Sequence, residues 1–253
     1  MAYILSVFFF ALGSILASFV LVVAERIYTG QSWHKGRSAC NSCARELGIL
    51  DLIPVLSYVT SRGRCRTCGS KVPGMYLLAE LVLGTLFLLS YQLAGLTPAL
   101  GALLASLVLL TGLVAYDLRH LIVPTGFSLP FIACALLYAI LSSPSSTALG
   151  LTLMTAGSIG LLFFLFHVVS RGRAMGLGDA PVALGLALIA GPLAVSGLMY
   201  SFWVGGVIGI VILSVRRPGS RMNSEVPFVP FLACGFLLAL FTTWDILYIV
   251  GIR

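Results

Sequence analysis

Long apolar stretches recur along this chain and limit what it can fold into. A helix needs about 20 apolar residues to cross a lipid bilayer. Hydrophobic residues make up 59% of the 253 residues and charged residues only 9%, and a soluble domain of this length could not hide so much apolar surface from water. We therefore expect an all-α integral membrane protein with about eight transmembrane helices, at residues 3–23, 75–94, 98–116, 123–141, 147–169, 179–191, 193–215 and 227–250.

The basic residues predict how these spans are oriented. Cytoplasmic loops keep an excess of Lys and Arg. With the N-terminus outside, eight spans place 14 of the 15 basic residues in cytoplasmic loops, at 24–74, 117–122, 170–178 and 216–226. A seven-span alternative, in which 180–215 forms one kinked helix, would put Arg216, Arg217 and Arg221 outside. We therefore favour eight spans in the cytoplasmic membrane.

The predicted spans divide the chain into three parts. Residues 1–23 form the first transmembrane helix, residues 24–74 form a loop large enough to fold by itself, and residues 75–253 form a helical bundle.

The net charge of +7 does not indicate a nucleic-acid partner. Its basic residues follow the loops between spans, as retention in the cytoplasm requires, so the expected partner is the lipid bilayer.

The loop 24–74 holds two Cys-x-x-Cys pairs, Cys40 with Cys43 and Cys65 with Cys68. Two such turns can bring four thiolates around one tetrahedral zinc ion. Thiols stay reduced in the cytoplasm, which favours metal binding over disulfides. Four thiolates leave no open coordination position, so the zinc would be structural and would supply much of the loop's folding free energy. The alternatives are a redox pair or cysteines without a shared role.

Two acidic residues lie at the ends of predicted spans. Asp117 closes the third span and Asp179 opens the sixth, and the predicted topology puts both at the cytoplasmic face. An acidic residue within a span is costly and indicates function. Two close carboxylates share a proton near neutral pH, so one can act as general base on a water and the other as general acid toward an amide. The pair therefore predicts peptide hydrolysis without a covalent intermediate.

Gly176 and Gly178 precede Asp179 in the tetrapeptide GLGD. Glycine allows close approach of backbones, which would leave room for an extended substrate strand. A helix cap is the alternative role for Asp179. The same alternative fits Asp117 poorly, because the helix dipole disfavours a carboxylate at a helix C-terminus.

Glu80 lies about one turn inside the second predicted span. It is a candidate for lining a polar cavity in the membrane. The alternative is a side chain that snorkels to the interface.

Together these motifs resemble those of bacterial type IV prepilin peptidases. The resemblance covers residues 13 to about 184 and rests on Asp117 with Pro124 in D-x6-P form, the GLGD tetrapeptide, and the sequence DLIPVLSY between the cysteine pairs. ASF at 17–19 with Arg26, and YLLAEL at 76–81, resemble the family's GSF…R and YPLxEL segments. Two positions depart from the family pattern: Leu21 stands in place of an Asn and Leu77 in place of a Pro.

The resemblance implies a membrane aspartic endopeptidase with Asp117 and Asp179 as its catalytic residues. Such enzymes cleave the basic leader peptide from prepilins or pseudopilins at the cytoplasmic membrane face. The cysteine loop is similar to the family's zinc-binding insertion. Many members also methylate the new N-terminal amine with S-adenosylmethionine.

Two other classes of protein remain open from the sequence. A polytopic transporter could use Asp117, Asp179 and Glu80 as a proton or cation relay. A non-catalytic membrane scaffold could use the zinc loop to recruit a partner.

Overall fold

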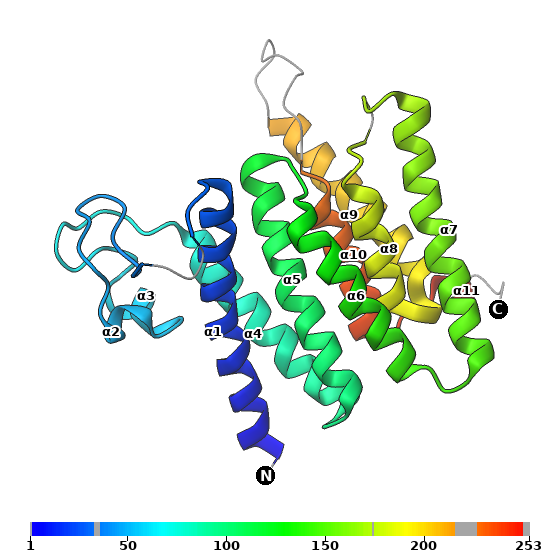
Figure 1. Cartoon of the computed structure of the whole chain (residues 1–253), viewed down its shortest axis with the longest axis horizontal. Coiled ribbons are helices and arrows are strands. Elements are labelled where there is room, and N and C mark those ends of the chain that lie inside the picture. The colour runs from blue at the N-terminus through cyan, green and yellow to red at the C-terminus, as the bar shows by residue number, and fades with distance from the viewer. Residues whose placement is uncertain (1, 33–35, 174, 216–226, 250–253) are drawn as a thin grey trace. The chain divides into compact units, whose positions relative to one another are not determined.

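Apolar helices account for almost all of the regular structure. The computed structural model describes residues 2–32, 36–173, 175–215 and 227–249, and over these ranges every named element is a helix, beside two isolated β-bridges (Figure 1). Six helical segments are long and apolar enough to cross a membrane: Tyr3–Tyr28, Gly74–Ala94, Pro98–His120, Thr125–Ser142, Ser146–Ser170 and Asp179–Val211. The predicted class, an all-α integral membrane protein, is confirmed.

The predicted number of eight spans is not confirmed. Helix α8 (Asp179–Ala190) and helix α9 (Ala194–Val215) are joined by a single turn of 3-10 helix, η1 (Gly191–Leu193), so they contribute one candidate span instead of two. The Gly191-Pro192 pair was expected to separate two helices. It does end α8, because Gly191 is the C-cap of that helix with a left-handed φ of 56°, and α9 begins at Ala194.

The last predicted span, 227–250, is interrupted. Helix α10 (Val229–Thr242) has 14 residues, and its C-cap Thr243 has a left-handed φ of 54°. A short helix, α11 (Ile246–Ile249), follows the break. The Ser196 side chain stabilises it, since its hydroxyl donates to the Asp245 carboxylate at 2.8 Å and accepts the Ile246 N–H at 3.1 Å. The predicted loop 216–226 lies outside the described residues, and the predicted orientation stays a prediction.

The chain forms two compact units, Met1–Leu96 and Thr97–Arg253. In the first unit, α1 (Ala2–Tyr28) packs antiparallel against α4 (Gly74–Ala94). Gly13 and Gly84 let the two backbones meet, because a side chain on Gly13 would lie 2.7 Å from the Leu83 carbonyl oxygen. Small residues at a helix contact are the usual device for close packing in membranes. The segment between these helices carries α2 (Ile49–Leu52) and α3 (Leu56–Thr60).

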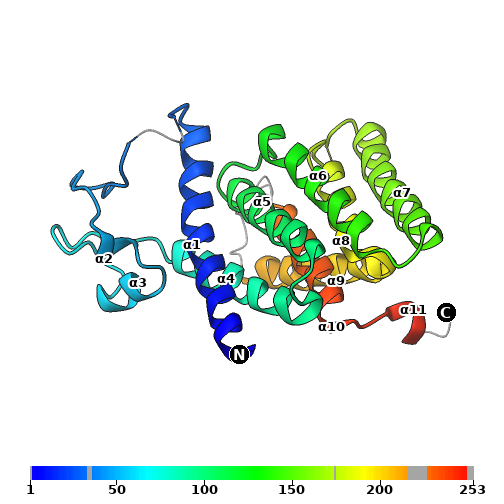
Figure 2. The same cartoon turned by 60° about the horizontal axis from the view of Figure 1, so that its bottom comes forward.

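The second unit is built around α8. This helix packs against α6 (Thr125–Ser142), α7 (Ser146–Ser170), α9 and α10, and it lies between α6 and α7 in both views (Figures 1 and 2). Ten of its 12 residues are buried. Helix α5 (Pro98–His120) packs against α6 and α10. An acidic residue at the first position of α8 is therefore placed inside the bundle.

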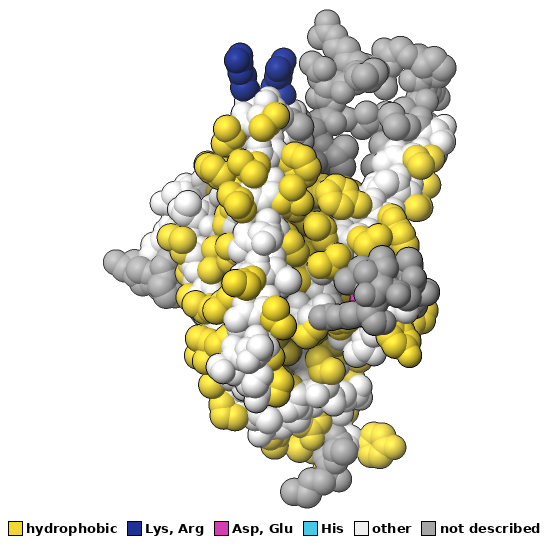
Figure 3. All heavy atoms as spheres, turned by 90° about the vertical axis from the view of Figure 1, so that its right-hand side faces the viewer, with side chains coloured by type: hydrophobic (Ala, Val, Ile, Leu, Met, Phe, Trp, Pro, Cys, Tyr) yellow, Lys and Arg dark blue, Asp and Glu magenta, His cyan; other side chains and the backbone are white. Residues whose placement is uncertain are grey.

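The outward face of α7 is apolar along its length (Figure 3). Ten large hydrophobic side chains of this helix are exposed: Leu151, Leu153, Met154, Leu161, Leu162, Phe164, Leu165, Phe166, Val168 and Val169. A soluble protein rarely exposes so large a continuous apolar surface. This face fits a lipid environment.

Candidate functional site

Asp117 lies in the last turn of α5 and is only 5% exposed. Its carboxylate accepts a hydrogen bond from the backbone N–H of Val229 at 3.1 Å. Val229 is the first residue of α10, so this N–H has no partner within its own helix. The N-terminus of α10, with its partial positive charge, therefore offsets part of the cost of burying the carboxylate.

Asp179 is the first residue of α8 and is 8% exposed. Its carboxylate accepts the N–H of Gly176 at 3.2 Å, and its own N–H donates to the Gly176 carbonyl at 3.3 Å. Gly178 occupies the N-cap position of α8, and no side chain caps the helix there. Asp179 is therefore not the N-cap of α8. Its carboxylate instead accepts a hydrogen bond from the loop that precedes the helix.

The fold brings the two aspartates together. They come from different helices, α5 and α8, and α10 packs against both. The two carboxyl groups are close enough for the negative charge of Asp117 to act on Asp179. Two buried acids that interact in this way can divide the roles of general acid and general base.

Gly178 fills a position where a side chain does not fit. A Cβ at this position would collide with the Val123 side chain, in the connection between α5 and α6. A Cβ on Gly176 would meet only the Asp179 carboxylate oxygen, at an ordinary contact distance of 3.6 Å. The close approach that Gly178 permits is therefore to Val123, which fixes Asp179 relative to the end of α5.

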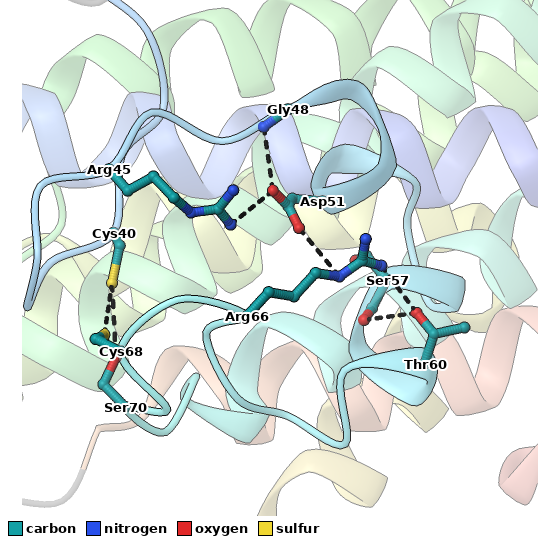
Figure 4. Close-up of polar contacts among 9 residues, drawn as sticks. All are labelled: Cys40, Arg45, Gly48, Asp51, Ser57, Thr60, Arg66, Cys68 and Ser70. Carbon is teal, nitrogen blue, oxygen red and sulfur yellow. Dashed lines mark hydrogen bonds and ion pairs between the residues drawn. The ribbon is translucent and has the colours of Figure 1, made fainter.

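The four loop cysteines form one cluster. Their sulfur atoms all lie within 4.8 Å of one another, and the Cys40 and Cys68 Sγ atoms are 3.8 Å apart (Figure 4). Four sulfurs around a tetrahedral zinc, with Zn–S bonds of about 2.3 Å, would be separated by about 3.8 Å. The residues fit a zinc ion, with Cys40, Cys43, Cys65 and Cys68 as its ligands.

The thiols of this cluster influence one another. Hydrogen bonds from Ser70 and from two backbone N–H groups lower the pKa of Cys40 to about 6. The Arg45 N–H would lower the pKa of Cys43, but burial and the three neighbouring thiols raise it to about 11. Thiolates this close repel, and a divalent cation at their centre would neutralise them.

An ion-pair cluster connects the two halves of the cysteine loop. The Asp51 carboxylate is 2.8 Å from the Arg45 guanidinium, 3.4 Å from Arg66, and 3.1 Å from the Gly48 N–H (Figure 4). Arg45 follows the first cysteine pair and Arg66 lies within the second. The Asp51 carboxylate therefore links the turns that carry the two cysteine pairs.

Glu80 lies in α4 and is 6% exposed. Its carboxylate accepts the Val55 N–H at 2.7 Å, and the Ser18 hydroxyl interacts with the same group. Glu80 is thus buried at a junction of α4, α1 and the cysteine loop.

Neither Val55 nor Val229 has a side chain with a chemical signature, because each contributes only a backbone N–H. Sequence reasoning missed both residues for this reason.

Fold and site together define a multi-pass helical membrane protein with a buried aspartate pair and a four-cysteine loop. Comparison with known proteins shows which family has this architecture. The sequence model of the bacterial peptidase A24 N-terminal domain matches residues 11–93, and that of the type IV leader peptidase family matches residues 102–214. These ranges follow the two compact units of the structure.

Three relatives illustrate the similarity, each named prepilin leader peptidase/N-methyltransferase. That of Bacillus subtilis is 29% identical over 234 residues, 91% of either chain. That of Myxococcus xanthus is 31% identical over 226 residues, 87% of this chain and 67% of the relative. That of Aeromonas hydrophila is 31% identical over 210 residues, 81% and 71% of the two chains. No solved structure matches. The chain belongs to the type IV leader peptidase family.

Proposed function

We propose that this protein is a membrane aspartic endopeptidase that removes the basic leader peptide from type IV prepilins or pseudopilins. The proposal places cleavage at the cytoplasmic membrane face and includes N-methylation of the new N-terminus. Its main support is the aspartate pair: Asp117 and Asp179 are buried, interact electrostatically and each accept a backbone N–H. Both lie in the range that matches the type IV leader peptidase family.

The pair supports hydrolysis by a bound water. One ionised carboxylate takes a proton from the water, whose oxygen attacks the scissile carbonyl carbon. The other, protonated carboxyl group donates its proton toward the amide, and the C–N bond then breaks to give a free carboxyl and a free amine. The Val229 and Gly176 N–H groups hold the two carboxylates in place, so little reorganisation is needed during the reaction.

Zinc bound by the four cysteines would have a structural role. Its four thiolate ligands leave no position for water or substrate. A zinc ion would cross-link the turns at Cys40–Cys43 and Cys65–Cys68 and stabilise the loop that meets Glu80.

Methyl transfer needs a donor, and the names of the relatives imply S-adenosylmethionine. When bound, it would supply a methyl group to the new N-terminal amine, with a C–N bond formed, the C–S bond broken and one amine proton released. The amine itself is a product of the aspartate pair, so cleavage must precede methylation.

Mass spectrometry of a co-expressed prepilin tests the proposal. The wild type should yield a pilin shortened by its leader and one methyl group heavier at its new N-terminus. Asp117→Asn and Asp179→Asn, like the two alanine variants Asp117→Ala and Asp179→Ala, should leave the leader in place, whereas Asp245→Asn, the same change outside the pair, should process it normally. Normal processing by both alanine variants would refute the assignment of the pair.

A further inference from the structure

The short helices α2 and α3 of the cysteine loop bury none of their own residues. Residues 49–60, which we call the α2–α3 segment, carry six large hydrophobic side chains that are exposed: Ile49, Leu50, Leu52, Ile53, Leu56 and Val59. Helices of a single turn are not stable by themselves and depend on the burial of apolar side chains. Among the described residues the segment has no buried core of its own, so these side chains need an apolar surface to cover them.

The ion pairs of Asp51 hold the segment on its polar side. The Asp51 side chain is only 14% exposed and pairs with Arg45 and Arg66, which lie before and after the segment in sequence (Figure 4). Helix α3 packs against α2, and the two lie side by side in both views (Figures 1 and 2). The neighbours of Asp51 in sequence, Leu50 and Leu52, stay exposed. The segment is therefore held by its polar residue, while its apolar residues are left uncovered.

A contact with α4 sets the depth of the segment. The Glu80 carboxylate accepts the backbone N–H of Val55, between α2 and α3, at 2.7 Å. Glu80 is the seventh residue of α4, so it lies about 9 Å along the helix axis from the first residue. Since α4 is long and apolar enough to cross a membrane, the α2–α3 segment lies beside a spanning helix and not beyond its end.

A second contact, with α1, gives the same depth. Leu52 lines one cavity together with Phe19 and Val22 of α1. Val22 lies six residues, about 9 Å, before the end of the candidate span at Tyr28. Amphipathic helices at a membrane surface bury their apolar side chains about 5–10 Å into the boundary between headgroups and acyl chains. The contacts with α1 and α4 both place the segment at this boundary.

Basic side chains follow the segment. Arg62, Arg64 and Lys71 are exposed, and within the described part of the chain none of the three takes part in an ion pair. Arg62 directly continues α3, because its backbone N–H donates to the Val59 carbonyl at 3.2 Å. The whole loop 24–74 has eight basic residues against three acidic ones. Cationic side chains beside an apolar segment match the anionic phospholipids of a membrane surface.

We propose that the α2–α3 segment inserts its apolar side chains into the membrane interface, with Arg62, Arg64 and Lys71 against anionic phospholipid headgroups. The cysteine loop is then attached to the bilayer at three places: the end of α1, the start of α4 and the α2–α3 segment between them. Lipid supplies the apolar surroundings that these one-turn helices need.

A prepilin is the competing occupant, because it would also offer an apolar surface. The proposed substrate carries a basic leader, which the basic side chains around the segment would repel. The contacts of Val55 with Glu80 and of Leu52 with α1 are made within the chain itself, so they hold the segment at this depth without a substrate. Both charge and depth therefore favour lipid.

The test places single tryptophans in the segment of the full-length protein. The background without native tryptophan is made by three substitutions: Trp33→Phe, Trp203→Phe and Trp244→Phe. Ile49→Trp and Leu56→Trp then report on α2 and α3, and Asn41→Trp, at an exposed position in the first cysteine turn, is the control. Melting temperatures show whether each variant is folded.

Nanodiscs of brominated phosphatidylcholine quench tryptophan in the acyl region, and acrylamide quenches it in water. Both segment variants should lose most of their fluorescence to the brominated lipid and resist acrylamide. The Asn41→Trp control should behave in the opposite way. Because the two reporters lie in different helices, failure of one variant to fold still leaves the other to decide.

Lipid charge tests the basic side chains. Adding phosphatidylglycerol to the nanodiscs should increase the lipid quenching of Leu56→Trp, and high salt should remove the increase. Combining Arg62→Gln, Arg64→Gln and Lys71→Gln should return the quenching to its level in neutral lipid. Arg37→Gln is the control and should leave the increase unchanged, because Arg37 is already paired with Glu46.

Four results would overturn the inference. Quenching of both segment variants by acrylamide as strongly as the control would show that the segment lies in water. Shielding from both quenchers would show that protein covers it. Exposure to acrylamide that ends when a prepilin is added would make the segment a substrate surface. Quenching in anionic lipid that the triple glutamine variant leaves unchanged would overturn the contact between the basic side chains and the headgroups.

Discussion

The backbone N–H of Val229 donates to the Asp117 carboxylate at 3.1 Å, across 112 positions of sequence. The bond places the start of α10 at the end of α5 and gives a buried acid a partner that no substitution at Val229 other than proline removes. Asp117 therefore has two properties, its charge and its role as a hydrogen-bond acceptor. Different substitutions can test each of them separately.

Asp117→Asn should abolish leader cleavage while preserving stability, because the amide oxygen can still accept the Val229 N–H. Asp117→Ala should abolish cleavage and also cost about 1–3 kcal/mol of stability, since it leaves a buried N–H without a partner. Cleavage assays and thermal unfolding in detergent measure the two effects. Equal melting temperatures for the two variants would show that the bond contributes little.

Gly178→Ala should destabilise the protein and reduce cleavage, because the new methyl group collides with the Val123 side chain. Overpacking of this kind costs about 1–3 kcal/mol. Adding Val123→Gly to the variant removes the colliding atoms and should restore part of the lost stability. The comparison is Gly176→Ala, whose methyl group meets only an ordinary contact and should leave the melting temperature near that of the wild type. A Gly178→Ala variant as stable as the wild type would contradict the packing argument.

Much of the fold and of the candidate site follows from sequence. Apolar runs predicted the helices from Gly74 to Ser170 closely, and Thr97 before Pro98 starts α5 with a side-chain cap. The spacing of the four cysteines predicted a cluster, and the structure brings their sulfur atoms together. Local periodicity and ligand spacing suffice for features of this kind.

The remaining features depend on tertiary contacts. Whether a Gly-Pro pair ends a span depends on what surrounds it: Gly191 ends α8 with a left-handed φ of 56°, but a single turn of 3-10 helix leads directly into α9. The break after Thr242 is stabilised by Ser196, which lies far away in sequence. Backbone donors such as Val55 and Val229 leave no trace in side-chain chemistry. Residues of these kinds become visible only when the chain is folded.

The zinc prediction concerns metal content. The purified wild type should contain about one zinc per chain. Cys43→Ser or Cys65→Ser should lose it, and the cysteine loop should then lose protection from amide hydrogen exchange, because zinc supplies much of the folding free energy of small metal-binding modules. Cys134→Ser, in α6, is the matched control and should keep the metal. Elemental analysis that finds no zinc in the wild type would remove this prediction.

The last prediction concerns Asp51 and pH. Burial alone would raise the pKa of Asp51, but the Gly48 N–H, the Arg45 guanidinium and the Arg66 charge together lower it. A carboxylate whose folded pKa lies below its unfolded value of about 3.9 stabilises the fold at neutral pH and loses this effect as the pH falls through the folded pKa. Asp51→Asn should therefore speed amide exchange between the cysteine pairs at pH 7, and the difference from the wild type should shrink below about pH 4. Glu46→Gln is the control, because its pair with Arg37 is exposed on both sides and such pairs contribute little. A difference between Asp51→Asn and the wild type that stayed constant with pH would show that the ionised carboxylate is not what holds the two cysteine pairs together.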